Sequence, residues 1–381
     1  MGVTNCSGID AASGLPVSIG IEKSINSVLT GDSREVNFIA PGWIDLQVNG
    51  FAGVDYNRPD TPPEEIARSI ETLFSTGVTR FFPTVITGPP DAMRGALRNL
   101  AGAKESLPEG EAIEGLHVEG PHISTEDGPR GAHPRQWVRQ PDLDEFRRWQ
   151  DASRGQVKIV TLAPEWPEAP RYIEAIVSRG VVAAIGHTDA SRAQIADAVS
   201  AGATLSSHLG NGAHTLLRRH PNYLWEQLAE DRLMASFIVD GIHLDGSFLK
   251  VALRAKGIER SILVTDAATP AGAAPGRYRM GELDLELKPD GRVVLAGQNR
   301  LAGSGLRMDR GVQNLVKLAG LPLAAAIRMA TVNPASAAKI TGRTAGLVAG
   351  ERADLVQFRW DAVARSIDVL ATWISGRKVF G

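Results

Sequence analysis

The sequence predicts an α/β protein: a closed (β/α)8 barrel of the TIM type with a small β-sandwich domain built from both chain termini. Two observations predict the barrel. Short apolar runs rich in β-branched residues recur along the chain, and stretches with helical spacing of apolar residues separate them. An open, doubly wound parallel sheet is the alternative, because periodicity alone is compatible with both folds. The runs number eight, at residues 42–48, 79–85, 113–119, 157–162, 181–187, 204–208, 235–240 and 261–266.

The segments between these runs have the features of helices and turns. Residues 63–75 and 192–201 place apolar side chains at helical spacing. Gly180 and Gly202 each predict the end of a helix in front of the next strand. A hairpin is expected at residues 277–301, with Pro289-Asp290-Gly291 as its turn.

Both ends of the chain predict β-structure outside the barrel. Short strands are expected at residues 15–22 and 37–39, and again at 353–359, 367–374 and 377–380. Because these segments lie at opposite ends of the chain, we expect them to assemble into one small domain. The predicted boundaries are residues 1–40 with 343–381 for this domain and 41–342 for the barrel.

Composition narrows the classes of protein. The chain has 381 residues, 43% hydrophobic and 22% charged, which is typical of a globular protein with a large core. A net charge of -2 gives no reason to expect binding to nucleic acid or to an anionic membrane. Cys6 is the only cysteine, the N-terminus does not resemble a signal peptide, and no apolar run approaches the ~20 residues that span a bilayer. We therefore expect a cytoplasmic protein.

Five polar side chains occur where predicted strands end or just beyond. Glu119, His187, His208 and Asp266 end their apolar runs, and His243 follows another run. A helix cap, a hydrogen-bonded core histidine or a loop carboxylate would explain any one of them alone. A barrel, however, brings the C-terminal ends of its strands together around one axis. The five side chains are therefore expected to form one site.

A carboxylate with imidazoles suits a divalent cation such as zinc, with water completing its coordination shell. A bound cation lowers the pKa of that water to about 7 and polarises a carbonyl oxygen. Asp266 is then the expected general base toward the water and acid toward a leaving amine. This chemistry hydrolyses an amide without a serine nucleophile. Ser304 is a weak candidate for one, because Ala302 occupies the position where a nucleophile elbow has glycine.

Motifs along almost the whole chain resemble those of the N-acetylglucosamine-6-phosphate deacetylase family of the amidohydrolase superfamily. PGWIDLQVNG at residues 41–50 is similar to the family's first barrel strand, and LHVEGP at 116–121 to its metal-glutamate motif. IGHT at 185–188 and SHLGN at 207–211 resemble its two metal-histidine motifs. LVTDA at 263–267 resembles the strand that ends in the catalytic aspartate, and LAGS at 301–304 and ATVNPA at 330–335 also match. Their order and spacing together make the resemblance specific.

The resemblance implies a role for each matching residue. Glu119, His187 and His208 correspond to metal ligands, and Asp266 to the acid/base. Residues 47–49 read Gln-Val-Asn where many amidohydrolases have a His-x-His pair for a second metal, so a single divalent ion is implied. Zinc is the first choice, with iron, cobalt or manganese as alternatives. The implied substrate is an amino-sugar phosphate, N-acetylglucosamine 6-phosphate, which loses its acetyl group, and the implied assembly is a homodimer.

Substrate contacts follow from the same resemblance. A guanidinium at Arg219 suits a phosphate, and the alternative is a solvated basic turn at residues 218–220. The remaining histidines have no part in the predicted mechanism. The implied substrate residues are Ala132, His133, Asn211, Gly212, Arg219, His243, Ala302, Gly303 and Ser304.

The loop after Asn211 departs from the family pattern. The family continues with a small residue and Met-Pro, and later with Gly-Arg-Glu-Pro-Gly, whereas this chain reads GAHT at 212–215 and RRHPNYLW at 218–225. The difference leaves the sugar, and the need for its phosphate, open. One alternative is an amidohydrolase that acts on another N-acyl sugar, an N-acyl amino acid or a cyclic amide. Another is a metal-binding paralogue without turnover that binds a sugar phosphate.

Overall fold

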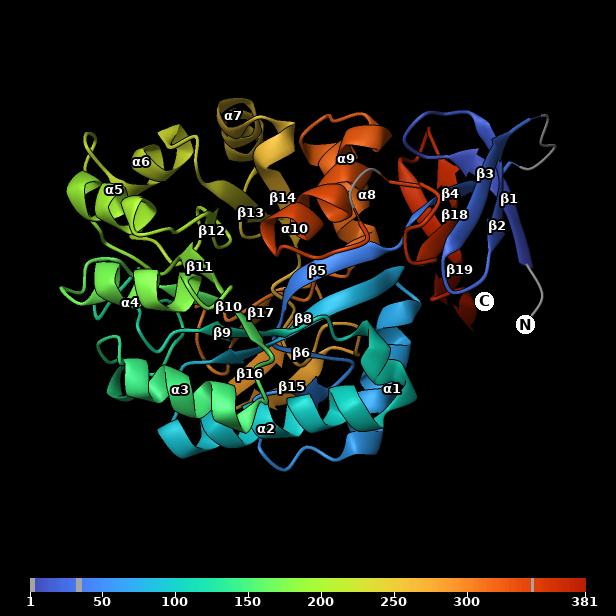
Figure 1. Cartoon of the computed structure of the whole chain (residues 1–381). Coiled ribbons are helices and arrows are strands. Elements are labelled where there is room, and N and C mark those ends of the chain that lie inside the picture. Colours follow the sequence, from blue (N-terminus) through green and yellow to red (C-terminus); the bar gives the residue numbers. More distant parts are fainter. Residues whose placement is uncertain (1–3, 32–35, 344–345) are drawn as a thin grey trace.

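Eight parallel strands form the central sheet of the computed structural model, which describes residues 4–31, 36–343 and 346–381 (Figure 1). The first and last strands meet through a parallel bridge between Val48 and Ala267, so the sheet nearly closes into a barrel. This arrangement confirms the predicted barrel over the open sheet. In sheet order the strands are β5 (Trp43–Val48), β8 (Val78–Ile86), β9 (Leu116–Glu119), β10 (Val157–Leu162), β11 (Val182–Ile185), β12 (Leu205–Ser206), β13 (Met234–Ile238) and β14 (Ser261–Val264).

Apolar side chains cover both faces of these strands. On β11, Val182 and Ala184 belong to one buried cluster, while Ala183 and Ile185 belong to another. Successive side chains on a strand point to opposite faces. A strand that is buried on both faces is therefore apolar at every position, and the apolar runs of this sequence show that pattern.

Helices connect the strands and surround them in Figure 1. The two helices predicted by spacing are present: α1 begins with a proline followed by Glu64 and Glu65, and Ser191 caps α5 through a capping box with Gln194. The α-helices are α1 (Pro63–Phe74), α2 (Pro90–Ser106), α3 (Leu143–Ala152), α4 (Ala169–Val177), α5 (Arg192–Ser200), α6 (Tyr223–Ala229), α7 (Gly246–Lys256), α8 (Met308–Leu318), α9 (Leu323–Ala330) and α10 (Val332–Ala337). Short 3-10 turns are η1 (Pro108–Ala112), η2 (Arg135–Trp137) and η3 (Ile258–Arg260).

Strands from both chain ends form a second sheet beside the barrel, as the sequence predicts. Its order is β20 (Arg377–Phe380), β19 (Ser366–Ile374), β18 (Leu355–Asp361), β4 (Phe38–Pro41), β1 (Thr4–Asp10), β2 (Pro16–Ile21) and β3 (Ile25–Thr30). The ring of Phe358 on β18 lies 6.2 Å from that of Trp43 on β5, and Thr372 donates a hydrogen bond to the carbonyl of Phe74 in α1. The sheet therefore packs directly on the barrel. The domain boundaries at 40 and 343 stay a prediction.

A buried ionic cluster also joins the two parts. Asp354, just before β18, lies 2.6 Å from the guanidinium of Arg80 on β8 and 2.8 Å from that of Arg352. The Arg343 guanidinium lies 3.9 Å away, and neither its side chain nor that of Asp354 is exposed. Burial raises the pKa of Asp354, but the surrounding arginines outweigh burial and lower it below its ordinary value.

The predicted hairpin is part of a three-stranded sheet of β15 (Gly276–Met280), β16 (Leu283–Leu287) and β17 (Val293–Leu295). Its predicted turn, Pro289-Asp290-Gly291, lies between β16 and β17. The short strands β6 (Gly50–Phe51) and β7 (Val54–Asp55) follow the first barrel strand. Among the described helices, none combines the length and the apolar character needed to cross a membrane.

Candidate active site

Three of the predicted site residues lie just beyond the ends of their strands. His187, His208 and Asp266 are each the second residue after β11, β12 and β14, whereas the apolar runs predict them as the last residues of those strands. Their φ angles are 51°, 30° and 51°, in the left-handed region that strains any residue other than glycine. This backbone conformation ends each strand early. Glu119 is the last residue of β9.

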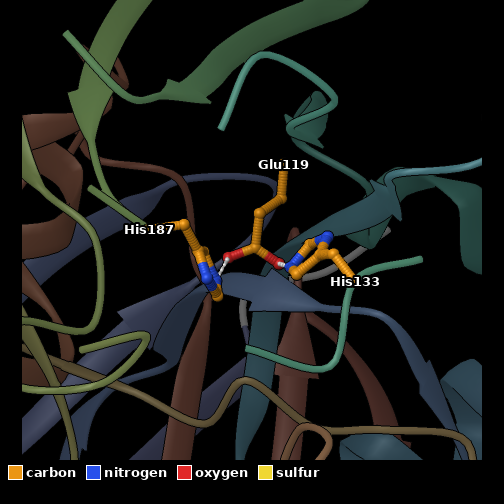
Figure 2. A group of neighbouring side chains, drawn as sticks. All are labelled: Glu119, His133 and His187. Atoms are coloured by element: carbon orange, nitrogen blue, oxygen red, sulfur yellow. Dashed lines mark ion pairs between the residues drawn. The ribbon is translucent and has the colours of Figure 1, made fainter. Parts of the chain in front are cut away.

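The carboxylate of Glu119 is the centre of the site. Its Oε1 lies 2.6 Å from Nε2 of His208 and 3.4 Å from Nε2 of His187. Its Oε2 lies 3.8 Å from Nε2 of His133, so the carboxylate lies between His187 and His133, as Figure 2 shows. All four side chains are buried.

Hydrogen bonds at the far ring nitrogens orient two of these imidazoles. Nδ1 of His187 lies 2.8 Å from the carbonyl oxygen of Pro129, which can only accept, so Nδ1 carries a proton and Nε2 faces Glu119. Nδ1 of His133 lies 2.8 Å from the hydroxyl of Thr87. An imidazole held in this way presents its second nitrogen as a ligand, and such outer contacts accompany most metal-bound histidines.

The donor set fits a divalent cation. One ligand atom from each of Glu119, His133 and His187 lies within 4.8 Å of the others, and His208 contacts the same carboxylate. Nδ1 of His208 is buried without a hydrogen-bond partner among the described residues. Two overlapping ligand sets therefore share Glu119 and His187: the predicted one with His208, and one with His133.

Two amides connect the carboxylates of Glu119 and Asp266. Nε2 of Gln47 donates to Oε1 of Glu119 at 2.8 Å and to Oδ1 of Asp266 at 2.9 Å. Nδ2 of Asn49 donates to the same Asp266 oxygen at 2.7 Å. The two residues that stand in place of a His-x-His pair thus hold the two acidic groups in position.

Burial and mutual charge set the protonation of these groups. Burial raises the pKa of Glu119, but hydrogen bonds from His187 and His208 outweigh it and hold that pKa well below its ordinary value. Burial lowers the pKa of His208, but the hydrogen bond from its ring to Glu119 and the Glu119 charge outweigh burial and raise it to about 9. Burial, and then the charge of Glu119, raise the pKa of Asp266 to about 6. Asp266 is therefore suited to exchange protons near neutral pH.

A cavity of about 440 Å³ opens above this cluster, and most predicted site residues line it. Ser304 does not: its hydroxyl donates to the carbonyl of Thr265 at 2.5 Å, and its backbone N–H donates to the carbonyl of Asp266 at 2.9 Å, so it lies behind the acid. Arg219 is exposed and does not line the cavity. The predicted residues that do are Glu119, Ala132, His133, His187, His208, Asn211, Gly212, His243, Asp266, Ala302 and Gly303.

Glycines allow the loops to close around His187. A Cβ on Gly212 would lie 2.5 Å from Nδ1 of His187, and the φ of Gly212 is 55°. A Cβ on Gly131 would lie 3.1 Å from Cε1 of the same ring. The loops after β9 and β12 can therefore approach this histidine only because these positions lack a side chain.

Several residues line the cavity without being predicted as site residues. Asn49 is one of them, and its position in the sequence, where many amidohydrolases have the second histidine of a His-x-His pair, could have identified it. His214 has no part in the predicted mechanism, yet it lines the cavity. Arg300 directly precedes the LAGS motif at 301–304, a neighbourhood that could have identified it. The others are Ile86, Gly128, Gly131, Gly210, Ala213, Thr215, Met280, Leu283 and Leu301.

Comparisons with known proteins agree with this geometry. Residues 38–379 match the model of the Amidohydrolase family. An N-acetylglucosamine-6-phosphate deacetylase from Vibrio furnissii is 32% identical over 342 residues, which are 90% of this chain and 83% of the relative. A protein of the same name from Homo sapiens is 35% identical over 355 residues, with the same coverage of 90% and 83%.

Solved structures are similar over the full length. A mutant of N-acetyl-D-glucosamine-6-phosphate deacetylase from Mycobacterium smegmatis, in complex with N-acetyl-D-glucosamine-6-phosphate, is 31% identical. It superposes with a TM-score of 0.90 and 100% coverage of both chains. The enzyme of that name from Thermotoga maritima is 26% identical, with a TM-score of 0.85 and coverage of 98% and 97%. The chain described here therefore belongs to the amidohydrolase family, and within it to the family of the N-acetylglucosamine-6-phosphate deacetylases.

Proposed function

We propose that this protein hydrolyses N-acetylglucosamine 6-phosphate to glucosamine 6-phosphate and acetate. The observation that carries the proposal is the placement of Asp266 in one cavity with Glu119, His187 and His208, where Gln47 joins it to Glu119. A proton-transfer group next to a metal-ligand cluster is the arrangement that metal-assisted amide hydrolysis requires. The substrates of the relatives add support for the amino sugar.

Glu119, His187 and His208 are the residues we propose as ligands of one divalent ion, with zinc as the first choice. When bound, the ion supplies positive charge that polarises the acetamide carbonyl and acidifies a water. His133 would be a substrate contact, since its Nδ1 is held by Thr87 and its ring lines the cavity. Iron, cobalt and manganese remain compatible with the same ligands.

Asp266 carries the proton transfers in this proposal. Its carboxylate takes a proton from water as the water oxygen bonds to the acyl carbon, and returns that proton to nitrogen as the carbon–nitrogen bond breaks. The second proton of the water, left on the new carboxyl group, passes to the amine, so the products are acetate and the ammonium form of the sugar. Asn49 and Gln47 keep the carboxylate facing the cavity, and the backbone of Ser304 holds the Asp266 main chain.

The remaining predicted contacts are proposed to bind the sugar. His243 lines the cavity, and its Nδ1 lies 2.6 Å from Oδ2 of Asp240, which fixes the ring. Ala132, Gly212 and Gly303 line the same space. Arg219 stays a predicted phosphate ligand, although it does not line the cavity of its own chain. We also propose a homodimer and a cytoplasmic location. The single cysteine, Cys6, supports the location, because disulfides are rare in the reducing cytoplasm.

Acetate release by the zinc-loaded protein tests the proposal, with N-acetylglucosamine 6-phosphate, N-acetylglucosamine and a panel of N-acyl amino acids as substrates. Fast release from the phosphorylated sugar supports the proposed reaction. Faster release from another amide would change the proposed substrate but would leave the proposed amide hydrolysis in place. Asp266→Asn should retain metal and lose about 10²- to 10⁴-fold in kcat. Normal turnover in a metal-loaded Asp266→Asn protein would remove Asp266 from the mechanism.

A further inference from the structure

Apolar side chains form one wall of the cavity, and the proposed mechanism gives them no role. Ile86, Met280 and Ala302 are buried in one hydrophobic cluster, and Leu283 packs against this cluster while half-buried. All four residues line the cavity. We refer to these four residues as the apolar wall.

The apolar wall adjoins both acidic groups of the site. Ile86 on β8 is paired with Glu119 in the register of β8 and β9. At the other end, the N–H of Ser304 is bonded to the carbonyl of Asp266, which places Ala302 close to the acid. The methyl group of an acetamide is bonded to the reacting carbon, about 1.5 Å away, so it must also lie close to these acids. A methyl group has no polar atom, and burial against an apolar surface is favourable for it.

A second cavity, of about 140 Å³, adjoins the apolar wall. We call it the side cavity. Ile86 and Leu283 line both cavities. An apolar cavity of roughly 150 Å³ is large enough to bind benzene, so the side cavity has room for a chain of several carbon atoms. Its other apolar residues are Pro59, Val85, Pro89, Ala92, Met93 and Pro134.

Two hydrogen bonds fix the backbone next to Leu283. This residue follows the loop Gly281-Glu282, which joins β15 to β16. The N–H of Gly281 donates a hydrogen bond of 2.7 Å to the carboxylate of Asp55, and the indole N–H of Trp137 donates one of 2.6 Å to the carboxylate of Glu282. Because both loop residues are anchored, Leu283 has a defined position between the two cavities.

We infer that the apolar wall receives the methyl group of the substrate's acetyl group, and that Leu283 limits the length of the acyl chain that the protein removes. The inference rests on the proposed function. An acetyl group ends at the wall, whereas a longer chain meets Leu283. Shortening this side chain joins the side cavity to the active site, where it would take the linear alkyl chain of an N-acylated amino-sugar phosphate. A hydrophobic pocket discriminates one methylene by about 10- to 200-fold.

Leu283→Ala tests the inference, with Leu295→Ala as the matched control. Leu295 lies on β17 of the same small sheet and packs half-buried against the same cluster, but it lines neither cavity. Carboxylate release by the metal-loaded proteins is measured from glucosamine 6-phosphate N-acylated with acetyl, butyryl, hexanoyl or decanoyl groups. Calorimetry on the same variants in an Asp266→Asn background measures the binding of these compounds with turnover suppressed. Leu283→Val is a milder change that replaces the alanine variant if the latter does not fold.

We expect the parent protein to prefer the acetyl over the butyryl compound at least about tenfold in kcat/KM. Leu283→Ala should raise the butyryl-to-acetyl ratio of kcat/KM at least about tenfold, and the ratio of binding affinities by a similar factor. The hexanoyl compound should gain as well. The decanoyl chain exceeds the side cavity, so this compound should stay a poor substrate of every variant. Leu295→Ala should leave all these ratios unchanged.

Other outcomes separate the inference from the proposed function. If the parent protein releases acetate but the butyryl-to-acetyl ratio is the same in the folded Leu283 variant, the proposed function stands and the inference is wrong. An equal gain in Leu295→Ala, or equal rates of the parent protein with all four compounds, would also overturn the inference. If the parent protein hydrolyses none of the compounds, the proposed function fails, and the ratio of binding affinities then decides the inference.

Discussion

The side-chain amide of Asn49 donates a hydrogen bond of 2.7 Å to Oδ1 of Asp266, and this contact joins the ends of the first and last barrel strands. The backbone N–H of Asn49 also donates to the carbonyl of Ala267 at 2.7 Å. The seam that closes the barrel is therefore also the place where the proposed acid/base is oriented. Barrel closure and proton transfer depend on the same few atoms.

Replacing Asn49 by alanine should move the pH dependence of activity. The hydrogen bond from Asn49 favours the charged form of Asp266, whose pKa burial and the Glu119 charge have raised to about 6. Losing the donor raises this pKa further, so the base form is reached only at higher pH. We expect the acidic limb of the kcat/KM profile to shift upward by roughly half to one pH unit, the scale of one hydrogen bond.

Asn99→Ala is the control for this profile, because Asn99 lies on α2 and donates to the carbonyl of Thr61 outside the cavity. Its acidic limb should coincide with that of the parent protein. A limb that moves to lower pH in Asn49→Ala would contradict the assigned role of the amide.

The two overlapping ligand sets make different predictions for His208 and His133. If Glu119, His187 and His208 hold the metal, His208→Ala should lose at least about 100-fold in metal affinity, since outer-shell partners alone are worth 10- to 100-fold. His133→Ala should retain metal and lose turnover. Metal content after dialysis against a graded chelator, together with acetate release, measures both effects.

The exposed His220 provides the control for this comparison, since His220→Ala should change neither quantity. The reverse pattern, with metal lost from His133→Ala and kept in His208→Ala, would assign the metal to the set with His133, whose ligand atoms lie within 4.8 Å of those of Glu119 and His187.

Gly212→Ala should disturb the metal site through His187. The new Cβ would lie 2.5 Å from Nδ1 of His187, so the ring or the loop must move. Gly320→Ala is a matched control, because Gly320 also has a positive φ, 73°, but a Cβ there would meet nothing within 4 Å. Both variants carry the left-handed backbone strain of about 1–2 kcal/mol. Only Gly212→Ala should lower metal affinity, and equal affinities would show that the loop yields without moving the ligand.

Much of the fold could be predicted because its signals are local. The eight apolar runs, the helical spacing at α1 and α5 and the Pro-Asp-Gly turn each lie within a few residues of chain. The predicted strand ends are too late at His187, His208 and Asp266. The apolar run continues to the polar residue, whereas the ladder stops where the backbone turns left-handed, and residue type does not reveal that turn.

In the candidate site too, local sequence patterns reveal some residues, and only the folded structure brings the others together. Glu119 and Asp266 could be found because each ends an apolar run, and the barrel then brings strand ends together. Arg300 and Gly131 are far apart in sequence and meet only through loops, so no local pattern predicts their contact. The prediction for Arg219 depends on counting along a loop that departs from the family pattern, and in the structure this residue lies outside the cavity.

Asp354→Asn should destabilise the protein strongly, because it leaves buried arginines without their shared carboxylate. Arg80 and Asp354 have side chains that are 3% and 0% exposed, and breaking a buried pair by removing one partner costs about 3–5 kcal/mol. Asp368→Asn is the control: Asp368 pairs with Arg359 at 3.2 Å, the arginine and aspartate side chains are 64% and 66% exposed, and such pairs contribute about 0–1 kcal/mol. Urea denaturation of both variants measures the difference. Similar midpoints would show that the barrel and the terminal sheet are held together by apolar packing, as between Trp43 and Phe358, rather than by this cluster.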